Sequence, residues 1–225
     1  MINRPKGTND IYGEEIEYWQ SFEKAARKVA GVFGFQEIRT PIFEMAELFI
    51  RSVGDETDIV QKEMYTFEDK AHRLLCLRPE GTAPVVRSFI ENNMASDGLP
   101  KQVYYMGPMF RYERPQAGRQ RQFHQFGAEL IGSSSPLADA EMIWMSIFLL
   151  EELRLHRYTL QVNMLGCQND REAYKAALKE HYRDKLDAIC PDCRRRYETN
   201  ALRLLDCKVE GCQAIKEGAP ILTDF

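Results

Sequence analysis

Residues 107–130 read GPMFRYERPQAGRQRQFHQFGAEL, and this stretch decides the fold. The ranges 101–113 and 121–131, which include most of it, are both rich in residue types that favour β-strands. The RPQAGRQ segment between them holds a proline and a glycine at positions compatible with a turn. The pattern therefore predicts a long antiparallel hairpin.

The end of this hairpin concentrates positive charge, although the whole chain has a net charge of −4. The guanidinium groups belong to Arg111, Arg114, Arg119 and Arg121. Guanidinium groups bind phosphate through paired hydrogen bonds, so these residues predict a local phosphate site. A solvated turn is the alternative interpretation.

The second strand has two different faces, because successive side chains of a strand point to opposite sides. One face combines a guanidinium, a ring, an amide, a glycine and a carboxylate, from Arg121, Phe123, Gln125, Gly127 and Glu129. Such a mixture is typical of a ligand site and not of a core. The same rule places a further set on one face of the first strand, namely Met109, Arg111 and Glu113.

The opposite face of the second strand becomes apolar toward Leu130 and is expected to pack against a helix. His124 lies on that face, so we expect a structural role for it. A second motif, the turn RPEGT at residues 78–82, leads from a strand into a helix. Thr82 is expected to cap the helix and Glu80 to face a ligand, with a purely helix-capping turn as the alternative.

Helices and further strands surround the hairpin. Apolar residues at helical spacing predict a helix at residues 14–33, which Gly34 would end. The other expected elements are strands at 35–38, 64–67, 73–78 and 158–164 and helices at 43–53, 82–94 and 136–153. The architecture is α+β with a mostly antiparallel sheet. Because the composition becomes charged and helical after about residue 168, we expect one domain at 1–168 and an inserted helical region at 169–225.

The composition excludes several classes of protein. The 225 residues are 44% hydrophobic and 28% charged, which excludes a disordered tail, a collagen-like chain and a globally basic nucleic-acid coat. The N-terminus lacks the apolar core of a signal peptide, and the strongest apolar stretch, residues 143–150, is too short to span a bilayer. The sequence predicts a soluble, cytoplasmic protein without a membrane partner.

The six cysteines do not form the pattern of a disulfide framework in a chain of this length. Two of them, Cys76 and Cys167, stand alone in apolar surroundings and are expected to be core thiols. The other four have the spacing CxxC followed by CxxxxC, which could close a tetrahedral zinc site: Cys190, Cys193, Cys207 and Cys212. Free thiols are the favoured interpretation of these four, structural zinc is the second and an adventitious disulfide is the third.

Several of these motifs resemble histidyl-tRNA synthetase. RPEGTAPVVR at residues 78–87 resembles its histidine-binding turn, and residues 107–130 resemble its second class-defining motif. RPKGTNDI at 4–11 is also similar, and residues 34–69 resemble the first class II motif, with Pro41 in the expected place. RRRYETNALRLLDCK extends the similarity into the inserted region. The resemblance implies the class II synthetase fold, an antiparallel sheet flanked by helices, and a homodimer with an interface around Pro41.

The resemblance also implies a reaction and a set of residue roles. Histidine, ATP with Mg²⁺ and tRNA(His) would be the substrates of a histidine–tRNA ligase that works through histidyl-adenylate. Arg111 would hold the α-phosphate and the reacting carboxylate, and the remaining ATP contacts would come from Glu113, Arg119, Arg121 and Phe123. Histidine would be held by Glu80, Thr82, Gln125 and Glu129. The loop at residues 114–118 would meet the tRNA acceptor end.

A full member of that family continues to a third motif and an anticodon-binding domain, which this sequence does not contain. We therefore expect an N-terminal fragment of the catalytic core, weak or inactive alone. The family's chemistry does not call for zinc. A synthetase-like regulatory subunit of ATP phosphoribosyltransferase, which senses histidine, is the main alternative, but the intact RPEGT turn, the complete hairpin and the inserted region oppose it. A generic nucleic-acid-binding module is a third and weaker interpretation.

Overall fold

The computed structural model describes residues 2–53, 57, 59–163 and 166–224. Two units form, Met1–Tyr158 and Thr159–Phe225, so the division falls before the boundary expected near residue 168. The strand expected at 158–164 is wrong for residues 158–163, which form no strand, and Met164 lies outside the described residues. Strands need a neighbouring edge to hydrogen-bond with, and Leu160 and Val162 are instead exposed.

The predicted hairpin is confirmed. Strands β5 (Lys101–Phe110) and β6 (Gln122–Ile131) pair in antiparallel register along their whole length, from Lys101 opposite Ile131 to Phe110 opposite Gln122. Strand β1 (Gln36–Glu37) pairs in parallel with the other edge of β5. In this register Met109 lies opposite Phe123, so odd-numbered residues of both strands share one face of the sheet.

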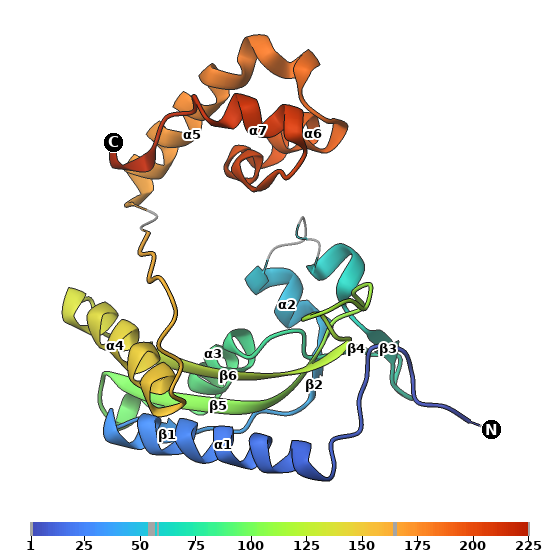
Figure 1. Ribbon diagram of the computed structural model, residues 1–225, viewed down its shortest axis with the longest axis vertical. Coiled ribbons are helices and arrows are strands. Elements are labelled where there is room, and N and C mark those ends of the chain that lie inside the picture. Colours follow the sequence, from blue (N-terminus) through green and yellow to red (C-terminus); the bar gives the residue numbers. More distant parts are fainter. Residues whose placement is uncertain (1, 54–56, 58, 164–165, 225) are drawn as a thin grey trace. The chain divides into compact units, whose positions relative to one another are not determined.

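The even-numbered face is covered by helices α1 (Glu14–Val32) and α4 (Pro136–Glu152), as Figure 1 shows. A buried cluster joins Val29, Tyr104 and Met145, with Phe126 packed against it, so the packing expected for this face is confirmed. His124 lies on the same face, with its ring centroid 4.5 Å from that of Trp19. Burial lowers the pKa of His124, which fits a structural residue.

A second small sheet has the order β2-β4-β3. Its strands are antiparallel: β2 (Phe43–Met45), β4 (Leu74–Leu77) and β3 (Thr66–Glu68). The helix expected at residues 43–53 therefore begins later, as α2 (Ala46–Val53), because Phe43–Met45 pairs with β4. Cys76 is completely buried beside Phe49, which confirms it as a core thiol. A π-helical turn, η1 (Ile59–Glu63), precedes β3.

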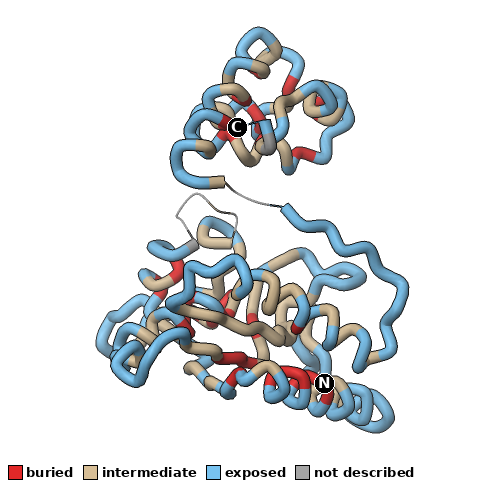
Figure 2. The backbone as a smooth tube through the Cα atoms, turned by 90° about the vertical axis from the view of Figure 1, so that its left-hand side faces the viewer, coloured by how far each residue is buried: buried red, intermediate tan, exposed pale blue. Residues whose placement is uncertain are grey.

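Helix α3 (Thr82–Glu91) lies against the odd-numbered face of the hairpin. Val85 packs with Val103, Tyr105 and Met109, so part of the face predicted as a ligand site is core instead. The expected helix to residue 94 is interrupted at Asn93, whose positive φ of 48° ends α3 before the 3₁₀ turn η2 (Met94–Asp97). Buried stretches, red in Figure 2, lie where these elements face each other.

The second unit is helical, as predicted. Its elements are α5 (Gln168–Tyr182), η3 (Arg183–Ala188), α6 (Pro191–Thr199), η4 (Ala201–Asp206), α7 (Glu210–Lys216) and η5 (Leu222–Asp224). A small core forms around Leu178, Tyr182 and Leu204. Cys167 is exposed at the N-terminus of α5, so its prediction as a core thiol is wrong. None of the helices in the described part of the chain combines the length and the apolar character of a membrane span.

Candidate active site

The loop end of the hairpin brings together three of the four arginines predicted to bind phosphate, namely Arg111, Arg119 and Arg121. Arg111 follows β5, and its Nε donates to the carbonyl oxygen of Pro79 at 2.9 Å. Its guanidinium lies over the ring of Phe123, 5.2 Å from the centroid, and Nη1 is 3.9 Å from Oε1 of Glu113. The backbone contact and the ring hold this guanidinium in place before any ligand binds. Charge, ring and carboxylate therefore lie together, as the alternation of the strands predicts.

Glu113 connects this group to the other arginines. Its Oε2 is 3.1 Å from Nη1 of Arg119, and its backbone carbonyl accepts a hydrogen bond of 3.3 Å from Nε of Arg121. The Arg121 guanidinium also covers the ring of Tyr112 at 4.1 Å. Arg114 lies in the exposed loop beyond this group. The end of the hairpin is therefore an ordered cationic site with one carboxylate inside it.

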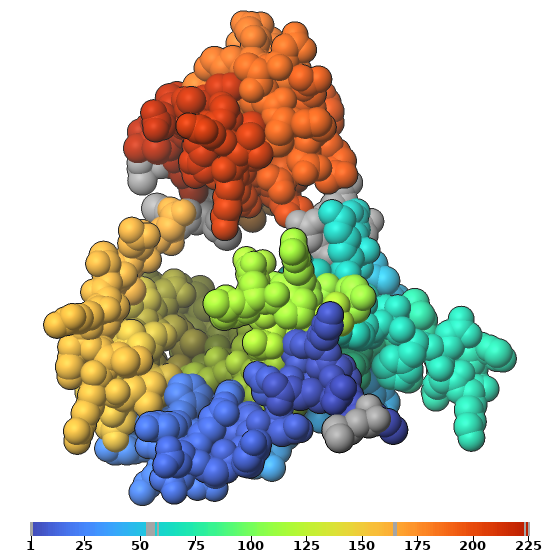
Figure 3. All heavy atoms as spheres, turned by 45° about the vertical axis from the view of Figure 1, so that its right-hand side comes forward, coloured from blue at the N-terminus to red at the C-terminus, as the bar shows by residue number. Residues whose placement is uncertain are grey.

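The N-terminal segment closes one side of the hairpin end. The carbonyl oxygen of Gly7 accepts hydrogen bonds from the backbone N–H groups of Arg121 at 2.7 Å and Gln122 at 3.0 Å. Gly7 has a φ of 83°, and a Cβ there would lie 2.8 Å from Cγ of Arg121, so glycine is required. Figure 3 shows this segment, in dark blue, against the hairpin in light green. A cavity of about 550 Å³ between them is lined by Arg4, Lys6 and Arg114, among others.

The RPEGT turn differs from its prediction in one respect. Glu80, and not Thr82, caps helix α3: its carboxylate accepts from the backbone N–H of Thr82 at 2.6 Å and from that of Ala83 at 2.9 Å. Thr82 is the first helical residue, and its hydroxyl points to the sheet instead. The carboxylate at a helix N-terminus is favoured by the helix dipole, which explains the exchange of roles.

Thr82, at the start of α3, contacts Glu129 of β6. The Thr82 hydroxyl donates to Oε1 of Glu129 at 2.7 Å. Burial raises the pKa of the Glu129 carboxyl, the Thr82 hydrogen bond opposes this rise, and the nearby Glu80 charge adds to it. A carboxylate held in a partly buried position with one oxygen already bonded is suited to accept a further N–H from a ligand.

Gln125 supplies a second polar group on this face. Its Oε1 is buried and has no hydrogen-bond partner among the described residues. A buried acceptor without a partner costs free energy unless something donates to it. Gln125 and Glu129 both belong to the odd-numbered face of β6, so the face offers acceptors for a ligand that carries N–H groups.

Sequence reasoning missed two residues that shape this face. Tyr105 packs its ring over both Gly127 and Gly81, where any Cβ would overlap it. Gly127 therefore makes room for the ring of Tyr105. Arg78 is 7% exposed, and its guanidinium donates to the carbonyl oxygens of Thr40 and Pro108 at 2.9 and 3.0 Å. The pairing of Tyr105 with Gly127 in the hairpin register could have predicted the position of the Tyr105 ring. No pattern in the sequence predicted the buried position of Arg78.

Comparisons with known proteins agree on the family. The family model described as histidyl-tRNA synthetase matches residues 7–200. The histidine–tRNA ligase of Thermosipho melanesiensis is 61% identical over 225 residues, which is 100% of this chain and 53% of the relative. That of Thermodesulfovibrio yellowstonii is 51% identical over 98% of this chain and 52% of its own length. The chain thus spans about half the length of the curated relatives it matches.

Solved structures give the same result. The apo histidyl-tRNA synthetase of S. aureus superposes with a TM-score of 0.77 at 38% identity, over 100% of this chain and 50% of that one. A Bacillus halodurans protein described as an ATP phosphoribosyltransferase regulatory subunit/histidyl-tRNA synthetase has a TM-score of 0.65 at 19% identity, over 95% of this chain and 61% of its own, which shows likeness of fold alone. The α+β fold is thus that of a class II synthetase, and the chain belongs to the histidyl-tRNA synthetase family.

Proposed function

We propose that this chain carries the histidine and ATP pocket of a histidine–tRNA ligase. In the first step the histidine carboxylate attacks the α-phosphorus of ATP, which forms histidyl-adenylate and releases pyrophosphate. In the second, the 3′-hydroxyl of tRNA(His) attacks the carbonyl carbon and AMP leaves. The observation that carries the proposal is the odd-numbered hairpin face, where cationic groups at one end adjoin buried acceptors along β6.

The cationic end is assigned to ATP. Arg111 would bind the α-phosphate and the reacting carboxylate, and Phe123, which already lies under its guanidinium, would stack on adenine. Glu113 would accept from the adenine amino group, and Arg119 and Arg121 would bind the remaining phosphates. The ion pair between Glu113 and Arg119 and the hydrogen bond from Arg121 to the backbone carbonyl of Glu113 hold these arginines in position before ATP arrives. Mg²⁺ would enter with ATP through the phosphate oxygens, and we assign it no protein ligand.

The acceptor-rich part of the face is assigned to histidine. Glu129 would accept from the imidazole N–H, and Gln125 would offer its buried, unpartnered oxygen to the α-ammonium group. Glu80 and Thr82 would complete the ammonium site, although both already bond within the chain. Adenylate formation needs no covalent help from the protein, so catalysis consists of positioning and of charge stabilisation at Arg111.

A homodimer and a tRNA contact extend the proposal beyond the pocket. Beyond Pro41, three large apolar side chains are exposed on one face of the small β2-β4-β3 sheet: Phe43, Met45 and Phe67. Such an apolar surface is typical of a protein interface. The exposed loop at residues 114–118 would meet the tRNA acceptor end. We also propose a cytoplasmic location, where tRNA and ATP are available.

The regulatory-subunit alternative receives less support. The structure that carries that description is 19% identical to the chain, whereas the histidine–tRNA ligase of Thermosipho melanesiensis is 61% identical. Both alternatives predict a histidine site. They differ in the ATP end of the hairpin, where this chain has the ordered group of Arg111, Glu113 and Arg119.

A stable mimic of the reaction intermediate tests the ligase proposal directly. A histidyl-adenylate analogue, with a sulfamoyl group in place of the phosphate, should raise the melting temperature of the chain more than histidine or ATP alone, because it fills both parts of the pocket. The alanyl analogue is the control and should have a much smaller effect. Equal shifts with both analogues, or none with either, would contradict the proposal, whereas a shift with histidine only would favour the regulatory alternative.

Replacing Glu129 by glutamine should separate histidine binding from ATP binding. We expect histidine affinity to fall by about tenfold, because a charged acceptor contributes about 1.5–3 kcal/mol to a hydrogen bond and the neutral amide less. ATP affinity should stay within about twofold, because an amide at this position removes no group assigned to ATP. Titration calorimetry with each ligand measures both values, and Glu151→Gln, an exposed change on α4, is the matched control. An equal loss of affinity for histidine and for ATP would contradict the assignment of Glu129 to histidine.

The same substitution should change the pH dependence of stability. Because burial raises the pKa of Glu129 in the folded chain above its ordinary value of 4.5, the folded state holds this proton more tightly than the unfolded state does. Stability is therefore lost as the pH rises from 4.5 through the raised pKa. Glu129→Gln should be the more stable protein at neutral pH, and the difference should vanish on acidification. Urea denaturation across this pH range measures the free energy of unfolding of both proteins. A more stable wild-type protein at neutral pH would contradict the raised pKa of Glu129.

A further inference from the structure

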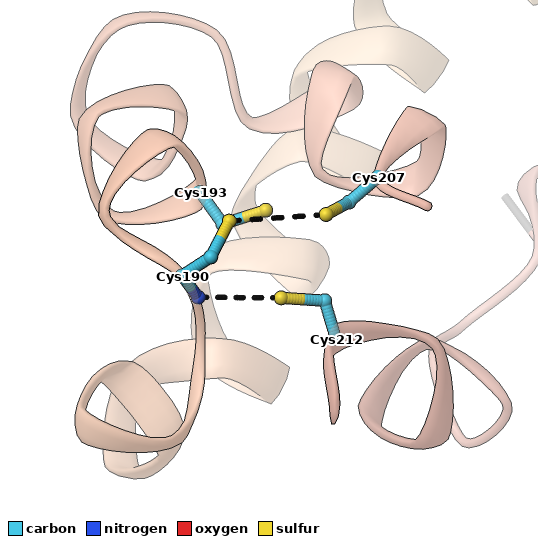
Figure 4. A group of neighbouring side chains, drawn as sticks. All are labelled: Cys190, Cys193, Cys207 and Cys212. Atoms are coloured by element: carbon cyan, nitrogen blue, oxygen red, sulfur yellow. Dashed lines mark hydrogen bonds between the residues drawn. The ribbon is translucent and has the colours of Figure 1, made fainter. Parts of the chain in front are cut away.

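Four cysteines of the second unit meet at one point. Cys190 precedes helix α6, Cys193 lies in its first turn, Cys207 follows η4, and Cys212 lies in α7. Their Sγ atoms all lie within 4.8 Å of one another. Figure 4 shows the four sulfur atoms directed toward one another, two from the start of α6, one from the residue after η4 and one from α7. The sequence alone favoured free thiols, because the loose spacing of the second pair did not require such convergence.

The distances fit a metal better than they fit a disulfide. A tetrahedral site with Zn–S bonds of about 2.3 Å places its sulfur atoms about 3.8 Å apart. The Sγ atoms of Cys190 and Cys207 are 3.9 Å apart, whereas a disulfide bond requires about 2.05 Å. All four thiols are free. A small contraction of the cluster would therefore give four equivalent sulfur ligands.

The burial and surroundings of the cluster fit a closed structural site. Cys193, Cys207 and Cys212 are at most 6% exposed, and Cys190 is half-buried. The backbone N–H of Cys190 donates to the Sγ of Cys212 at 3.3 Å, and a hydrogen bond of this kind stabilises a thiolate that binds a metal. Four sulfur ligands with no oxygen or nitrogen donor leave no open position for a substrate.

The cysteine cluster forms a large part of the small core of the second unit. Three of the nine buried residues in its core cluster are these cysteines. Folded regions below about 70–80 residues rarely derive enough stability from an apolar core alone and often use a structural metal. A metal ion bound by the four thiols would link α6, η4 and α7, each of which is short.

We propose that Cys190, Cys193, Cys207 and Cys212 bind one structural zinc ion that holds the second unit together. Sulfur-only tetrahedral sites select zinc or iron among the common metals. Zinc requires no redox partner, and the site needs only to be closed and rigid. The ion would take no part in adenylate formation, so the proposal is independent of the function assigned to the hairpin.

Metal analysis of the chain, purified under reducing conditions in zinc-containing medium, tests the proposal. We expect about one zinc per chain, and Cys207→Ser should reduce it at least about fivefold because three ligands hold the ion far less tightly. Cys167→Ser, which alters an exposed cysteine of the same unit outside the cluster, is the matched control and should retain the metal. Zinc below about one-tenth per chain, or equal zinc in both variants, would overturn the proposal.

Two measurements on the unaltered chain keep the test valid even if Cys207→Ser does not fold. Cobalt(II) added to metal-free protein should give the intense sulfur-to-metal absorption of a tetrahedral thiolate site, and zinc should displace it. A thiol reagent should label Cys167 alone in the zinc form and the four cluster cysteines in addition after chelation, because only Cys167 is exposed. Iron in place of zinc, absence of the cobalt bands, or a mass loss that indicates a disulfide would each overturn the proposal.

Discussion

Gly127→Ala should destabilise the chain by about 2–3 kcal/mol, because a methyl group has no space beneath the Tyr105 ring. The ring is itself confined from its other side by Gly81, so it cannot move away from the new atom without displacing the start of α3. Overpacking of this kind forces strain on the backbone or on the rotamer. Urea denaturation followed by circular dichroism measures the loss in the free energy of unfolding.

Gly31→Ala is the matched control for that result. Gly31 is an exposed position of α1, and a Cβ there would meet nothing within 4 Å. The same chemical change should therefore leave stability unchanged or raise it by up to about 1 kcal/mol, the helix propensity difference between glycine and alanine. A double variant that also carries Tyr105→Ala should recover part of the Gly127→Ala loss. Equal stability of the two alanine variants would show that the Tyr105 ring does not occupy this position.

Arg111→Ala should weaken ATP binding by about ten- to a hundredfold, which corresponds to about 1.5–3 kcal/mol for hydrogen bonds to a charged group. The substitution removes the guanidinium that is fixed by Pro79 and Phe123 and assigned to the α-phosphate. Arg111→Lys should give an intermediate loss, because lysine keeps the charge without the planar fork. Titration calorimetry with ATP and Mg²⁺ gives the dissociation constants.

An arginine outside the hairpin provides the control for charge. Arg157 is exposed near the end of the first unit, and Arg157→Ala removes the same charge as Arg111→Ala. Its ATP affinity should stay within about twofold of the unaltered chain, because Arg157 belongs to none of the segments assigned to ATP. Similar losses in the two variants would mean that ATP responds to net charge and not to a site at Arg111.

Much of the fold could be predicted because the hairpin obeys a simple rule of alternation. Odd-numbered residues from Arg121 to Glu129 share one face, and the register of β5 and β6 places Met109 opposite Phe123, as the rule requires. The charged end of the hairpin could be predicted for the same reason. The histidine end could be predicted only as a set of residue types, because the contact between Thr82 and Glu129 joins segments that are distant in the sequence.

The errors have a common physical cause, which is that tertiary contacts override local patterns. Phe43–Met45 has helical periodicity but pairs with β4, and residues 158–163 have strand character but form no strand. Glu80 accepts the capping hydrogen bonds of α3, a role that local preference assigned to Thr82. The four cysteines converge because α6, η4 and α7 fold together, which their spacing alone did not determine.

The most direct test of the histidine and ATP pocket is calorimetric titration of the purified, folded chain with ATP and Mg²⁺, followed by histidine. The account predicts that each ligand binds in a one-to-one ratio, that histidine binds more tightly than alanine, and that Arg111→Ala lowers the ATP affinity. Absence of binding of both ligands to a chain that is folded by circular dichroism would contradict the assignment of the odd-numbered hairpin face.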